Sequence, residues 1–217
     1  MKIKSIKDNN AGFSLIELIV SVLITGILMM AVGLFMSTSR TAYQTVSTSA
    51  KLQEEAMTVE RVMSEYIKEA QKYGLDEGLV ISGTEVDVFW VKAKENEGTS
   101  IAPSVYFFVH DKTKKNIRYY KGEEADVEET TGTVTTGGIA HLATGVFGAS
   151  EKYSLVASNV ESMEKKSFVQ RADGTDLICL KLTYSYLDKT YSDTLTAVTR
   201  NKNRTPSSFE PEPDPGP

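Results

Sequence analysis

The sequence holds little material for disulfide, metal or nucleic-acid chemistry. Among its 217 residues are one cysteine and two histidines, so an intramolecular disulfide is excluded and a metal cluster is not expected. Lys and Arg number 24 against 29 Asp and Glu. The resulting net charge of −5 argues against nucleic acid as a partner, since nucleic-acid binding needs a basic face. The length suits one domain, or a modest domain with appendages.

The signatures of common catalytic sites are also missing. The sequence contains no G-x-S-x-G elbow, Walker loop, H-E-x-x-H or C-x-x-C. His110 beside Asp111 could form a base and its orienter, but a surface turn is the favoured interpretation, and His141 is expected in a loop without a partner. Cys179 is expected to be a small buried thiol within a strand. We therefore predict a protein that is not an enzyme, with no catalytic residue, cofactor or metal.

One long apolar run dominates the N-terminal part of the chain. Residues 13–36 read FSLIELIVSVLITGILMMAVGLFM and carry a single charge, Glu17. As a helix they would extend about 36 Å, enough to cross a hydrocarbon core of about 30 Å. A buried core helix is the alternative, but such helices seldom need an apolar surface on every side. The run predicts a membrane-embedded segment.

The flanks of this run predict its orientation. Lys2, Lys4 and Lys7 precede it against only Asp8, and the first cation after it is Arg40. By the positive-inside rule, the N-terminus stays cytoplasmic and the chain after the run lies outside. The run is too long for a conventional secretory signal, whose apolar stretch covers about 7 to 15 residues.

The residues at the start of the run resemble a known processing site. The sequence Gly12-Phe13-Ser14-Leu15-Ile16-Glu17 is similar to the signature of type IV prepilins and of the pseudopilins of type II secretion and competence systems. The resemblance implies cleavage after Gly12 and methylation of the new amine of Phe13, both by a prepilin peptidase/methyltransferase. Further implied partners are other pilin subunits, bound through their N-terminal helices, and an inner-membrane assembly platform, with membrane lipid surrounding the helix before assembly.

Glu17 would be the fifth residue of the mature chain, and its position has a physical interpretation. An acidic side chain in a membrane helix costs about 2.5 to 3.5 kcal/mol, so it is expected to have a partner. Cleavage would create a positive amine on Phe13, four positions away and on the same helical face. The amine could belong to the same chain or to a neighbouring subunit, where pairing would set the register of assembly. The alternative is a glutamate that reaches the membrane surface and has no role.

The fold class expected from the remaining sequence is α+β. Leu52, Ala56, Val59 and Ile67 repeat at helical spacing, which predicts an amphipathic helix over residues 37–74 capped by Gly74. Beyond it the apolar period becomes two, with hairpins at residues 110–116 and 171–175 and a strand, residues 176–187, apolar on one face. These features predict a long N-terminal helix, half in the membrane and half packed on an antiparallel β-sheet. This arrangement is similar to the pilin fold, and the layout of the last strands is similar to minor pilins.

Two segments are expected to lack regular structure. Residues 121–150 combine an acidic cluster with a Thr/Gly-rich stretch, and a solvated loop is favoured over a calcium site because no D-x-D-x-D-G pattern occurs. Five of the six prolines fall in the C-terminal tail. The expected division of the chain is leader 1–12, transmembrane and filament-core helix 13–36, amphipathic helix 37–74, sheet domain 75–204 and Pro-rich tail 205–217.

The sequence thus predicts a minor pilin or pseudopilin that assembles into a type IV pilus-like filament. The precursor would be a single-pass membrane protein, and the mature chain would lie in an extracellular or envelope-spanning pilus. A second hypothesis is a membrane-anchored receptor or adhesin domain that is neither cleaved nor polymerised.

Overall fold

The chain folds as a long helix followed by antiparallel β-sheets, which confirms the predicted α+β class. The computed structural model describes residues 14–93, 104–128, 130–148 and 153–200. It divides into two compact units, residues 1–47 and residues 48–217. Helix α1, Leu15–Lys68, is continuous for 54 residues. The proposed cleavage site at Gly12 and Phe13 and the Pro-rich tail 205–217 lie outside the described residues.

The first unit consists, in its described part, of α1 alone. Every residue from Leu15 to Ser47 is exposed. The helix runs without interruption through Gly26 and Gly33, and a Cβ atom added to either glycine would meet nothing within 4 Å beyond the adjacent helix backbone. Leu28, Met29, Met30 and Ala31, which lose little or no rotamer freedom in a helix, lie between these glycines and offset their weak propensity.

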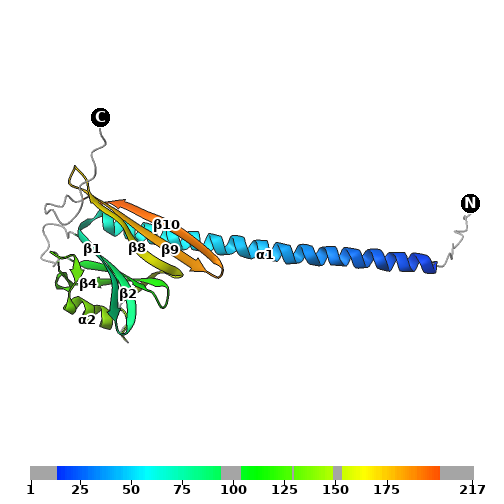
Figure 1. The fold of residues 1–217 in the computed structure, drawn as a ribbon, viewed down its shortest axis with the longest axis horizontal. Helices are drawn as coiled ribbons and strands as arrows, with labels where there is room; N and C mark the ends of the chain where they lie inside the picture. Colours follow the sequence, from blue (N-terminus) through cyan, green and yellow to red (C-terminus); the bar gives the residue numbers. More distant parts are fainter. Residues whose placement is uncertain (1–13, 94–103, 129, 149–152, 201–217) are drawn as a thin grey trace, which may run out of the picture. The chain divides into compact units, whose positions relative to one another are not determined.

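The second unit contains the end of α1, three sheets and two short helices (Figure 1). The five-stranded sheet has the order β1-β2-β3-β4-β7, the three-stranded sheet the order β10-β9-β8, and β5 pairs with β6. All pairings are antiparallel. The strands are β1 Ala70–Ile81, β2 Thr84–Ala93, β3 Val105–Asp111, β4 Asn116–Gly122, β5 Val127–Glu128, β6 Thr133–Val134, β7 Ser154–Ala157, β8 Val160–Gln170, β9 Asp176–Tyr186 and β10 Lys189–Val198.

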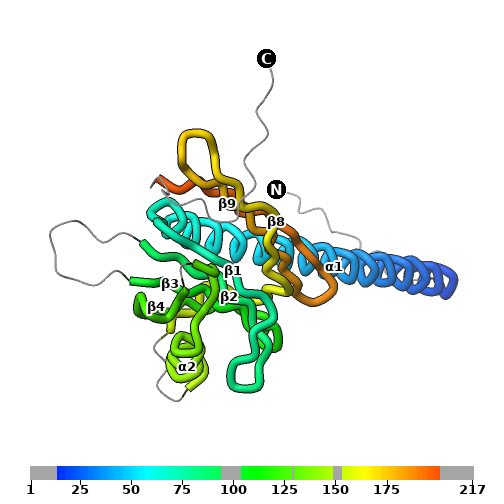
Figure 2. The backbone as a smooth tube through the Cα atoms, turned by 60° about the vertical axis from the view of Figure 1, so that its left-hand side comes forward, coloured from blue at the N-terminus to red at the C-terminus, as the bar shows by residue number. Residues whose placement is uncertain are grey.

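Residues 48–68 of α1 share one hydrophobic core with both larger sheets. The helix contributes a stripe at three-and-four spacing, and the cyan end of α1 lies against both sheets in Figure 2. The stripe consists of Leu52, Ala56, Val59, Met63 and Ile67. Strand β9 turns Ile178, Leu180 and Leu182 into this core and keeps Lys181 exposed. The predicted one-sided strand is therefore confirmed, as are both predicted hairpins, which join β3 to β4 and β8 to β9.

The end of α1 differs from the prediction. The helix ends at Lys68, and Gly74 lies inside β1, paired with Trp90 of β2. A Cβ atom on Gly74 would lie 2.3 Å from the carbonyl oxygen of Gly132. The glycine permits a close approach of two backbones; it does not cap the helix.

The segment expected to be a solvated loop is largely structured. After β4 come the 3-10 helix η1, Glu124–Asp126, the β5–β6 pair and helix α2, Thr136–Gly145. The side chain of Thr135 accepts a hydrogen bond from the Gly138 N–H at 3.1 Å and so caps α2. This segment covers the face of the five-stranded sheet turned away from α1 and forms a second core with Trp90. The prediction of a loop was wrong because these glycines and threonines gain their stability from tertiary contacts.

Candidate functional site

The N-terminal turn of α1 carries the acidic residue of the proposed assembly site. The Glu17 and Leu18 N–H groups both donate to the carbonyl oxygen of Ser14, at 3.0 and 3.2 Å. Glu17 therefore lies in the first turn, where a negative charge interacts favourably with the helix dipole. Ser14 and Glu17 also have the S-x-x-E spacing of a capping box. The sequence analysis did not use this spacing; because it is compatible with helix capping, experiments on Glu17 must separate capping from assembly.

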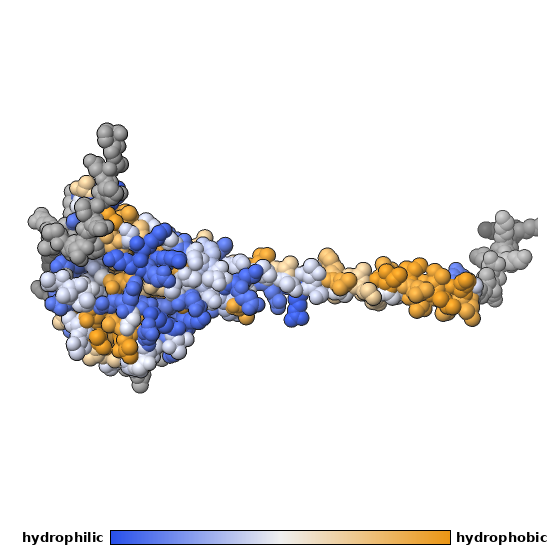
Figure 3. Space-filling model, viewed as in Figure 1, coloured by the Kyte–Doolittle hydropathy of each residue, from blue (hydrophilic) through white to orange (hydrophobic). Residues whose placement is uncertain are grey.

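The surface behind Glu17 is apolar on every side. Figure 3 shows hydrophobic residues gathered along the N-terminal part of α1. This part is long and apolar enough to cross a membrane, and none of its most apolar 18-residue window is buried. A core helix of a soluble protein passes the same length test, but its apolar surface would be covered. The bare surface needs lipid or other apolar helices around it.

Two hydroxyl side chains within this surface are satisfied by the helix itself. Ser21 Oγ donates to the carbonyl oxygen of Glu17 at 2.6 Å, and Thr25 Oγ1 donates to that of Ser21 at 2.7 Å. Such bonds to the preceding turn remove unpaired donors that would be costly in an apolar environment. The two polar residues are therefore compatible with a lipid-embedded helix, and Glu17 remains its single ionisable group.

Comparison with known proteins identifies the N-terminal segment. Residues 7–33 match the family model of the prokaryotic N-terminal methylation motif. The chain carries the N-terminal motif of type IV pilin-like proteins. The match includes Gly12, Phe13 and Glu17 and confirms the predicted resemblance to type IV pilins and pseudopilins. No curated protein and no solved structure matches the chain.

This pilin-type motif has consequences for processing and location. It implies processing by prepilin peptidase and assembly with other pilins. Together with the apolar helix, it indicates a membrane-anchored precursor. Glu17 lies four positions after Phe13 in the sequence, in the first turn of α1 and at the start of its apolar surface.

The two histidines lie in environments that the sequence did not predict. His110 is fully buried, so the expectation of a surface turn is wrong. Its carboxylate partner is Asp87, 23 positions away in the chain, and not the neighbouring Asp111. His141, expected to lack a partner, has its Nδ1 2.6 Å from Asp126 Oδ1. Neither pairing has a local sequence signal, because strand pairing and the docking of α2 create both.

The acidic cluster and Cys179 are the remaining candidates in the described part of the chain. Asp126, from the acidic cluster, is buried and also accepts a hydrogen bond from the Glu123 N–H at 2.8 Å. No group of three or more His, Cys, Asp or Glu side chains suited to a metal occurs among the described residues. Cys179 is half-buried, less than predicted, because it lies on the outer face of β9 near Thr196.

Proposed function

We propose that this chain is a minor pilin or pseudopilin subunit whose role is structural assembly, not catalysis. It would be cut after Gly12, methylated at Phe13 and inserted through α1 into a thin filament. The observation that carries the proposal is the pilin-type motif at the start of a helix whose N-terminal apolar part is uncovered, with none of its most apolar 18-residue window buried. Assembly would move the N-terminal apolar part of α1 out of lipid and bury it against the helices of other subunits.

Glu17 would act as the register lock of assembly. In lipid its carboxylate needs a positive partner, and the methylated amine of Phe13 on a neighbouring subunit supplies one. A short ion pair at this depth can form at only one axial offset between adjacent helices. The subunit would therefore slide along its neighbour until the charges meet. The layout of the last strands favours the minor-pilin branch of the family.

Before assembly, the precursor would place its N-terminus in the cytoplasm and the sheet domain outside. The basic residues of the leader support this orientation. The mature subunit would then enter an extracellular or envelope-spanning filament, with help from the inner-membrane assembly platform.

Mass spectrometry of the mature N-terminus tests this proposal against an uncleaved, membrane-anchored receptor. The proposed processing predicts a chain that begins at a methylated Phe13. A chain that retains residues 1–12 in a host with active prepilin peptidase would contradict it. A Gly12→Val variant, in which the residue before the scissile bond is bulky, is expected to accumulate as the full-length precursor.

A further inference from the structure

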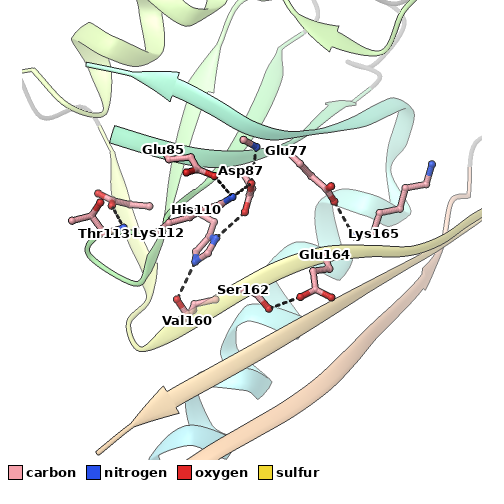
Figure 4. A network of polar contacts seen from close by, with 12 residues as sticks. Glu77, Glu85, Asp87, His110, Lys112, Thr113, Val160, Ser162, Glu164 and Lys165 are labelled. Carbon is pink, nitrogen blue, oxygen red and sulfur yellow. Dashed lines mark hydrogen bonds and ion pairs between the residues drawn. The ribbon is translucent and has the colours of Figure 1, made fainter. Parts of the chain in front are cut away.

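His110 lies at the junction between the two larger sheets. The side chain is fully buried on β3. Its Nδ1 is 3.2 Å from Asp87 Oδ2 on β2, and its Nε2 is 2.9 Å from the carbonyl oxygen of Val160 (Figure 4). Asp87 belongs to the five-stranded sheet, whereas Val160 begins β8 in the three-stranded sheet. One imidazole ring therefore bridges the two sheets.

Both partners of the ring are hydrogen-bond acceptors. The carbonyl oxygen of Val160 can only accept, and a carboxylate can only accept while it is ionised. Burial raises the pKa of Asp87, but hydrogen bonds from His110, from the Gly78 N–H at 2.9 Å and from Lys112 outweigh it and hold that pKa below its ordinary value. Asp87 is therefore ionised over the neutral range.

A neutral imidazole has one N–H and can serve only one of these two acceptors. The other contact would then set two lone pairs against each other in a buried site. Only the ring with a proton on both nitrogens donates to Asp87 and to Val160 at once. The same Val160 donates its own N–H to the carbonyl oxygen of Lys115 at 2.8 Å. The first residue of β8 is thus held to β3 and to the β3–β4 turn by both of its backbone polar groups.

Several other charged groups lie on the elements packed around the ring in the described part of the chain. On β2 and the β3–β4 turn, Lys112 contacts both Asp87 and Glu85. Further charged groups on the packed elements are the ion pairs of Lys115 with Glu161 of β8 and of Asp111 with Arg118 of β4, and Glu55 of α1, which accepts a hydrogen bond from the neutral amide of Asn159. Asp87 is the carboxylate that faces the ring directly, so the charge of His110 is balanced at that one contact.

We propose that doubly protonated His110 is a pH-dependent clamp between the two sheets of the exported domain. The clamp is closed while both ring nitrogens carry protons and loses one of its two hydrogen bonds as the pH rises. Its contribution to stability is therefore present at lower pH and lost towards alkaline pH. This inference is independent of the filament role, because it concerns contacts within residues 48–217.

Nuclear magnetic resonance of the full mature chain in detergent micelles, labelled with ¹⁵N-histidine, tests the protonation state. The chain has two histidines, so a His141→Gln variant assigns the remaining ring signals to His110. We expect both ring nitrogens of His110 to show the chemical shifts of protonated nitrogens at about pH 6 to 7, the range in which ordinary imidazoles lose their charge. The spectrum of a neutral tautomer in that range would overturn the proposal.

An Asp87→Asn variant tests the coupling between this proton and the sheet junction. The Asn side chain can keep an oxygen towards Gly78 and Lys112 and present its N–H₂ to Nδ1, so a neutral ring bonded to Val160 suffices. In the wild type, we compare the rate of backbone hydrogen exchange at the start of β8 with the intrinsic rate at the same pH. This ratio is expected to rise about tenfold once the ring loses a proton, because one hydrogen bond to a charged group is then lost. The variant is expected to lack this gain. The same gain in both proteins, or none in the wild type, would overturn the clamp.

Discussion

Gly74 shows how the absence of a Cβ atom at one residue permits close packing within the second unit. At Gly74, β1 packs against the turn between β5 and β6, and the indole Nε1 of Trp90 donates to the Gly132 carbonyl oxygen in this turn at 3.0 Å. A Cβ atom at position 74 would meet that oxygen at 2.3 Å and the indole nitrogen at 2.6 Å. Neither neighbour can retreat easily, because one is backbone and the other is a buried ring.

The Gly74→Ala substitution is therefore expected to destabilise the second unit by about 1 to 3 kcal/mol, the usual cost of overpacking a core. Urea unfolding of the mature chain in detergent, followed by tryptophan fluorescence, measures it directly, since Trp90 is the chain's single tryptophan. Gly137→Ala is the matched control. Its Cβ would meet nothing closer than 3.7 Å, and alanine favours the first turn of α2. Equal stability of the two variants would contradict the close-approach role of Gly74.

At the scale of elements, sequence patterns were informative where an element is defined by its own periodicity. The alternation in β9 and the stripe of α1 each predicted the correct face. The sequence could not place α2, whose Thr-Gly-Gly start is a poor helix former and which depends on the Thr135 cap and on Asp126. It also could not locate the end of α1, because residues 70–74 fit a helix until pairing with β2 makes them a strand.

In the second unit, α1 carries one methionine on its buried face and one on its exposed face, so the two faces can be compared with the same substitution. Met63 is fully buried in the core shared with the sheets, whereas Met57 is 68% exposed. Met63→Ala is expected to cost about 2 to 5 kcal/mol through lost burial and an incompletely filled cavity. Met57→Ala is expected to change stability by less than about 0.5 kcal/mol. Thermal unfolding followed by circular dichroism in detergent compares them, and similar losses in both variants would contradict the assigned core face.

At the scale of the whole molecule, the average composition hides two environments. The apolar run of residues 13–36 carries one charge, while the rest of the chain carries nearly all of the 24 basic and 29 acidic residues. Removal of residues 1–12 would take away three lysines and one aspartate, a net charge of +2, and so change the chain from −5 to −7. Within the processed apolar helix, Glu17 and the new amine would then be the two ionic groups, and their pairing leaves the segment electrically neutral.

Variants of Glu17 separate assembly from helix capping. Glutamine preserves the S-x-x-E/Q capping pattern with Ser14 but removes the charge, whereas valine removes both. If Glu17 pairs with the amine of a neighbouring subunit, both variants are expected to be cleaved normally and to enter sheared filaments at least about tenfold less than the wild type, since a charged hydrogen bond is lost in an apolar setting. Immunoblots of filament and membrane fractions measure this ratio, and Glu54→Gln, on the exposed face of the second unit, is the matched control. If Glu17→Gln assembled like the wild type while Glu17→Val did not, the side chain would act through capping, and the register lock would be refuted.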